Sequence, residues 1–142
     1  MKTKIALLLI LSLLIQSCKN ESKESTTEKT RMERVIAVHD ELMPKMNDIG
    51  KLTTALEAKI DSTETGQTYK VAKDSLVAAY DFMMDWMKGF GDKFDSEEIL
   101  EGKALSAEKE ALLIEEEERV NKMKKMMLGS IANAEALLSE DK

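Results

Sequence analysis

The chain has 142 residues, of which 43% are hydrophobic, 34% charged and only 4% aromatic. This length allows one domain of ordinary size. A single cysteine excludes an internal disulfide framework and a multi-cysteine zinc site, and a single histidine excludes a His-x-x-x-His metalloprotease. A formal net charge of −6 argues against a nucleic-acid-binding surface. Because no paired acid and base or nucleophile motif is recognisable, the sequence predicts a protein that is not an enzyme.

The first 17 residues predict an export signal that is removed. Lys2 and Lys4 precede the apolar run Ile5–Ile15 (IALLLILSLLI), which as a helix reaches about 16 Å and is too short for a hydrocarbon core of about 30 Å. Residues 15–18 (IQSC) then match a bacterial lipobox. Cleavage there leaves Cys18 first, with diacylglycerol on its sulfur and an acyl chain such as palmitate on its amine. Since two or more acyl chains attach a protein stably, Cys18 is the predicted membrane anchor. An ordinary secretory signal with an incidental cysteine is the alternative.

Residues 18–29 predict a lipidated polar tether. Lys19–Lys29 (KNESKESTTEK) contains no apolar residue, and a flexible coil of this length spans roughly 18 Å. Lys19 stands where an aspartate retains some lipoproteins at the inner membrane, which favours the outer membrane. Removal of Lys2 and Lys4 takes the formal charge from −6 to −8, so an anionic membrane surface should repel the body of the protein.

Residues 30–142 predict an all-α body, an up-down-up three-helix bundle with coiled-coil-like seams. Thr30 and Glu33 fit a capping box, and the first helix runs from there to a polar turn at Asp61–Gly66 (DSTETG). The second helix covers Gln67–Phe90, and the third begins between Ser96 and Ser106 and ends near Leu138. Short connections favour antiparallel neighbours. The inward positions, three and four residues apart, are Met32, Val35, His39, Leu42, Met46, Ile49, Thr53, Leu56 and Ile60; Tyr69, Ala72, Leu76, Ala79, Met83, Trp86 and Phe90; and Leu113, Glu116, Val120, Met123, Met127, Ile131, Ala134 and Leu138.

Pro44 lies inside the first predicted helix. Its nitrogen carries no hydrogen to donate to the carbonyl of Asp40, and its ring pushes against that carbonyl. We therefore expect a kink or a local opening between Asp40 and Pro44, one turn from His39. A bend that follows the bundle is the more ordinary reason for such a proline, and a functional site is the alternative.

His39 occupies an inward position, which is an uncommon place for the only histidine. Folding the second helix back across the turn near residue 64 places His39 near Phe90, with Met43 facing Trp86. The third helix passes this level near Glu116, which can accept a hydrogen bond from the imidazole. We expect His39 and Glu116 to form a satisfied buried polar pair, surrounded by methionine and aromatic side chains.

A soft-metal site is the alternative interpretation of the same region. Thioether and imidazole ligands suit Cu(I), and an exported protein can meet copper. The candidate ligands are His39, Met43, Met46, Met83 and Met87, with Met84 beside them. A further pair, Met123 and Met126, lies about 18 Å along the bundle and belongs to the core.

Two motifs carry a resemblance to a known group. The stretch from Val38 to Met46 (VHDELMPKM) and the stretch from Met83 to Met87 (MMDWM), together with the lipobox, resemble small flavobacterial-type lipoproteins often labelled "viral A-type inclusion protein". The resemblance covers most of Met32 to Leu138. It implies an envelope lipoprotein of helical fold, and it supplies no catalytic residues.

Together these patterns predict a lipid-anchored protein of the bacterial envelope that acts as a binding or structural module with a protein partner. The alternative is an exported metal-handling protein that binds copper. The sequence leaves open the identity of the partner and the oligomeric state.

Overall fold

A computed structural model describes residues 29–140, and this part of the chain is helical without any β-strand. The helices are α1 (Arg31–Leu42), α2 (Lys45–Glu57), α3 (Glu64–Gly91), α4 (Ser96–Leu100) and α5 (Ala107–Ser139). The predicted all-α class is therefore confirmed.

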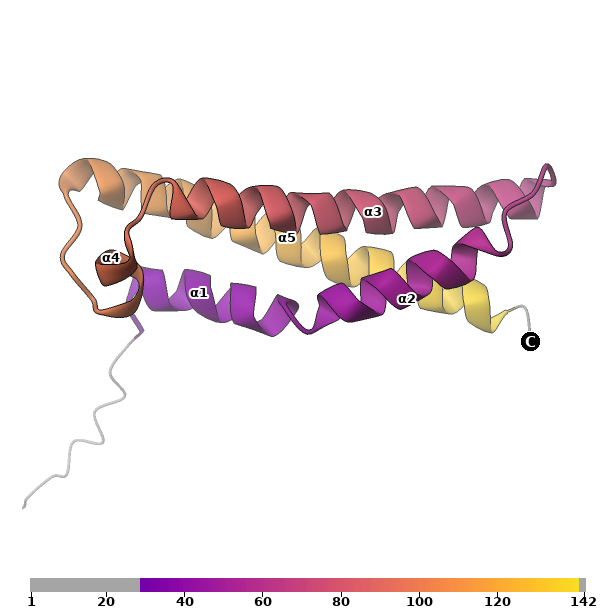
Figure 1. Ribbon diagram of the computed structural model, residues 1–142, viewed down its shortest axis with the longest axis horizontal. Coiled ribbons are helices and arrows are strands. Elements are labelled where there is room, and N and C mark those ends of the chain that lie inside the picture. The colour runs from indigo at the N-terminus through magenta and orange to yellow at the C-terminus, as the bar shows by residue number, and fades with distance from the viewer. Residues whose placement is uncertain (1–28, 141–142) are drawn as a thin grey trace, which may run out of the picture.

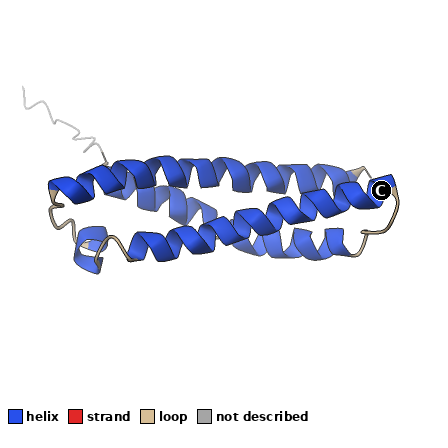
Figure 2. Ribbon diagram, turned by 90° about the horizontal axis from the view of Figure 1, so that it is seen from above, coloured by secondary structure: helices blue, strands red, loops and turns tan. Residues whose placement is uncertain are grey.

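The long helices lie lengthwise beside one another. Figure 1 shows α3 along one edge of the molecule, α1 and α2 in succession along the opposite edge, and α5 running behind them. Helix α1 packs on α5, α2 packs on both α3 and α5, and α3 packs on α5 along its length. The view from above in Figure 2 shows the same lengthwise arrangement, with the short α4 at the end of the molecule where α1 begins.

Most of the buried side chains fall on the predicted inward positions, and Phe94, Glu98 and Ser130 are buried outside them. All of the predicted positions on α3 are buried, from Tyr69 to Phe90, and on α5 all are buried except Leu138, which is half-buried. The first two helices bury Met32, Val35, Leu42, Ile49 and Leu56 and half-bury the remaining predicted positions, His39 among them. The spacing of apolar residues by three and four positions therefore predicted most of the core, because side chains at this spacing share one helix face.

Side chains cap the N-termini of α1, α3, α4 and α5. Thr30 and Glu33 form the predicted capping box of α1, and the hydroxyl of Thr63 accepts a hydrogen bond from the Gly66 amide at the start of α3. Ser106 caps α5, at the far limit of the predicted start. Helix α4, which the sequence analysis did not predict, begins with its own capping box, formed by Asp95 and Glu98.

Pro44 divides the first predicted helix in two. Helix α1 ends at Leu42, and the Met43 amide still donates to the carbonyl of His39 at 2.9 Å. Helix α2 then starts at Lys45, with Pro44 as its N-cap residue. The interruption expected between Asp40 and Pro44 is present, since the proline cannot continue the backbone ladder.

The predicted signal segment, Cys18 and all of the tether except Lys29 lie outside the described residues. Within residues 29–140 no helix combines the length and the apolar character needed to cross a membrane.

Candidate functional site

A row of rings runs along α3 toward α4. The imidazole of His39 lies 5.7 Å from the indole of Trp86, centroid to centroid, and Trp86 stacks on Phe90 at 4.8 Å. Phe90 contacts Phe94 at the same spacing. Trp86, Phe90 and Phe94 are buried, whereas the His39 side chain is 21% exposed and its Nδ1 lies 3.0 Å from Oδ1 of Asp40. His39 is thus the solvent-side end of an otherwise buried aromatic row.

Glu116 forms a buried ionic cluster with residues other than His39. Its carboxylate accepts hydrogen bonds from the ammonium of Lys93 and from Nη1 of Arg119, the latter at 2.9 Å. This replaces the predicted pairing of Glu116 with His39, whose hydrogen-bonding partner is Asp40. The chain just after α3 brings Lys93 to the carboxylate. A cation makes a stronger hydrogen bond to a carboxylate than a neutral imidazole does.

The proposed copper ligands differ widely in exposure. Met83 is fully buried in the core, Met46 and Met87 are half-buried, and Met43 is 40% exposed at the point where α1 ends. Across the described part of the chain, no three histidine, cysteine or acidic side chains are grouped so that they could hold a metal ion. Any metal site in this region would therefore depend on thioether sulfur.

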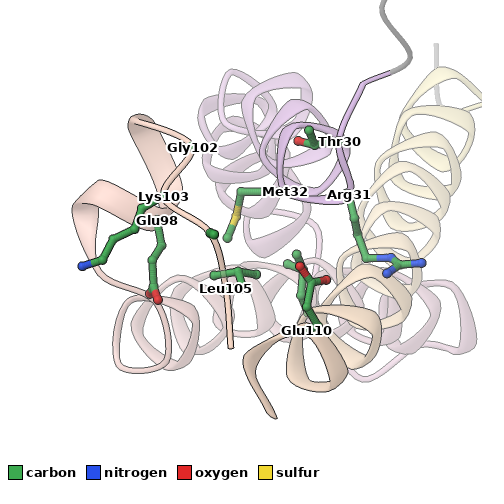
Figure 3. Close-up of a pocket in the computed structure, with 10 residues that line it drawn as sticks. Thr30, Arg31, Met32, Glu98, Gly102, Lys103, Leu105 and Glu110 are labelled. Carbon is green, nitrogen blue, oxygen red and sulfur yellow. The ribbon is translucent and has the colours of Figure 1, made fainter. Parts of the chain in front are cut away.

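A cavity of about 180 Å³ opens at the α4 end of the molecule. Figure 3 shows Met32 of α1 extending toward Leu105, with Glu98 on one side and Arg31 and Glu110 on the other. Glu98 is buried, and its carboxylate accepts a hydrogen bond from Lys109 at 2.5 Å. This hydrogen bond and the capping contact with the Asp95 amide hold the pKa of Glu98 below its usual value. A carboxylate already satisfied in this way offers no free acid or base to a ligand.

A groove between α2 and α3 has an almost wholly apolar lining. It has a volume of about 180 Å³ and lies between Gly50 and Thr53 of α2 and Val77 and Tyr80 of α3, with the buried Ile49 also lining it. Val77, Tyr80 and Met84 share one face of α3 at spacings of three and four, and their exposed fractions are 40%, 41% and 44%. We call Gly50, Thr53, Val77, Tyr80 and Met84 the apolar strip.

The apolar strip was not predicted from the sequence. Each of its three α3 residues directly follows a predicted inward position of that helix. Apolar side chains next to a complete set of inward positions were the feature of the sequence that could have indicated the strip. Lys93, which comes after the predicted end of the second helix, was missed for a different reason. Its role depends on the path of the loop, which periodicity does not describe.

In comparisons with known proteins, no family model, no curated protein and no solved structure matches the chain. The structure and its surface therefore define the chain only as a class, namely an all-α protein of packed long helices with one apolar strip exposed between two of them.

Proposed function

We propose that this protein is a lipid-anchored component of the bacterial envelope, attached to the outer membrane, which acts as a non-catalytic helical binding module. Its anchor is Cys18, exposed by removal of residues 1–17. The basic start, the short apolar run and the lipobox support this assignment, as does the resemblance to small flavobacterial-type lipoproteins.

The body of the module is residues 30–142, held out from the membrane by the tether at 18–29. We interpret the bent α1–α2 segment as one rod of an up-down-up three-helix bundle, with α3 and α5 as the others. Three ion pairs support this interpretation, because Glu117 of α5 joins both Arg31 and Arg34 of α1, and Lys124 of α5 joins Glu41.

The observation that carries the binding function is the apolar strip. Thr53, Val77 and Tyr80 present side chains around a hollow, and Met84 is exposed on the same face of α3, where a solvent-facing helix surface is normally polar. Contiguous apolar surface of this kind typically marks a protein-interaction site, and a partner helix can bury it.

Site-specific photo-crosslinking in intact cells tests this function. A photoreactive amino acid at Val77 should give a cross-linked product, whereas the same residue at Ile114 on α5 should give at least about tenfold less. Ile114 is a matched control because it is a similarly exposed aliphatic side chain, at 46% against 40%. Equal yields from both positions, or none from either, would contradict binding through the strip.

Copper handling is a second candidate, supported by the partly exposed imidazole of His39 in a segment that holds Met43 and Met46. Trp86 is the only tryptophan, and its ring lies against His39, so its fluorescence reports on this region. Stoichiometric quenching by Cu(I) that is lost in His39→Ala would support a copper site. Binding no tighter than micromolar, or quenching that persists in His39→Ala, would eliminate it.

A further inference from the structure

The apolar strip has charged residues along both of its margins. Lys51 follows Gly50 on α2, and Asp81 follows Tyr80 on α3. Because Gly50 and Tyr80 line the same groove, Lys51 and Asp81 stand at about the same height on opposite margins. Both are exposed, and within the described residues neither forms an ion pair.

The same arrangement recurs at the other end of this face with the signs exchanged. Asp40 follows His39 on α1, and Lys88 comes two residues after Trp86 on α3. The contact between the His39 and Trp86 rings brings these two positions to a similar height. At these two heights the α1–α2 margin therefore carries Asp40 and then Lys51, while the α3 margin carries Lys88 and then Asp81.

We propose that the apolar strip is a self-association surface, on which a second copy of this chain docks about a two-fold axis parallel to α3. This inference rests on the binding function proposed above and names its partner. Such an axis places α2 of each copy against α3 of the other at equal height. Lys51 then meets Asp81 of the partner copy, and Asp40 meets the partner copy's Lys88, each pair occurring twice.

A two-fold axis perpendicular to the helices does not bring opposite charges of the two copies together. Centred on the groove, it would bring Lys51 toward Lys51 and Asp81 toward Asp81, and like charges across an interface are unfavourable. The parallel axis also keeps Thr30 of both copies at the same end of the dimer, so two lipidated chains could stand on one membrane. The perpendicular axis would place these ends on opposite sides.

Gly50 allows close approach at the centre of the strip. A Cβ built at this position meets no atom of the chain within 4 Å, so the missing side chain leaves open space rather than a packed contact. The same is true of Gly129 on α5, which lies in a helix interior away from the strip. These two glycines make a matched pair for substitution.

Cysteine cross-linking of the full chain in membranes tests the proposed axis. One tagged chain carries Lys51→Cys, and a second, differently tagged chain carries Asp81→Cys; both keep Cys18. We expect a cross-link between the two tagged chains, at least about fivefold stronger than the product from either chain alone. Glu118→Cys with Lys122→Cys on the exposed surface of α5 is the control pair and should give background yield, as should the chain without added cysteines.

Each other outcome overturns the proposal. Homodimers of Lys51→Cys alone would indicate the perpendicular axis, and no product would exclude self-association here. Cross-links to a different protein would overturn self-association while leaving the binding function of the strip in place.

A second measurement separates the interface from the fold. Gly50→Glu should abolish the dimer in size-exclusion chromatography with light scattering of the detergent-extracted chain, whereas Gly129→Glu should leave it unchanged. Lys51→Glu should weaken association about five- to tenfold, since each surface ion pair contributes modestly and this one occurs twice. Adding Asp81→Lys should restore it. Equal effects of the two glycine substitutions would contradict the proposal.

Discussion

The guanidinium of Arg34 in α1 donates a hydrogen bond from Nε to Oε1 of Glu117 in α5 at 2.9 Å. Arg31 donates to the other oxygen of the same carboxylate, also at 2.9 Å. One acidic side chain therefore joins the first turn of α1 to the first third of α5. The hydrogen bond from Arg34, followed by that from Arg31, holds the pKa of Glu117 below its usual value.

Stability should therefore fall in acid. A carboxyl group whose folded pKa lies below its unfolded value of about 4.3 contributes stability above that pH and loses it as the pH falls through the folded pKa. Glu117→Gln should lower the free energy of unfolding by about 0.5–1 kcal/mol at pH 7 and flatten its dependence on pH below 5. Urea unfolding between pH 7 and pH 3 measures this. Glu118→Gln is the control, and an identical pH slope in both variants would refute the assignment.

The buried charge of Glu116 should be replaceable by an apolar side chain without a large loss of stability. Lys93 and Arg119 are 30% and 42% exposed, so both cations can turn to water when the carboxylate is removed. Glu116→Met should change the free energy of unfolding by less than about 1 kcal/mol, because an apolar side chain of similar size fills the space. Glu116→Ala should cost about 2–4 kcal/mol, because it leaves a cavity. A loss above about 2 kcal/mol for Glu116→Met in urea unfolding would mean that the ion pairs themselves stabilise the fold.

Replacing Pro44 with alanine should make the protein more stable. In Pro44→Ala the new amide can donate to the carbonyl of Asp40, and α1 can join α2 through residues 43 and 44. We expect a stabilisation of up to about 1 kcal/mol, well below the full helix-interior cost of proline, because Pro44 stands at an N-cap where it is tolerated. Hydrogen exchange should show a protected amide at residue 44. Destabilisation with no such protection would indicate that the packing of α2 requires the break.

Two glycines predict opposite effects of the same substitution. A Cβ on Gly66 would lie 2.0 Å from Oδ1 of Asp61 and 2.6 Å from its backbone nitrogen, so Gly66→Ala must displace the turn before α3 and should cost more than about 1 kcal/mol. Gly129→Ala meets no atom within 4 Å and should stabilise α5 by about 0.5–1 kcal/mol. Thermal unfolding of the two variants measures both effects, and shifts of the same sign would contradict these environments.

The parts of the fold that periodicity governs could be predicted from the sequence. The spacing from Tyr69 to Phe90 gave the buried face of α3, and Thr30 and Pro44 marked the first helix start and its interruption through their local chemistry. Helix α4 could not be predicted, because five residues are too few to establish a period. The partner of Glu116 depended on where the loop carries Lys93.

The candidate site was predictable to a smaller extent. Folding one helix back along another placed His39 near Phe90, whereas its ring lies against Trp86, about one turn earlier on α3. The apolar strip was missed because the flank of a helix is covered or exposed according to where its neighbour packs. Val77 and Tyr80 became recognisable as surface only once the position of α2 was known.

Mass spectrometry of the native protein extracted from membranes tests the central claim most directly. The account predicts a mature chain that begins at Cys18, lacks residues 1–17 and carries a diacylglycerol group and an amide-linked acyl chain on that cysteine. A chain that retains those residues, or one with a free thiol at Cys18, would contradict lipid anchoring.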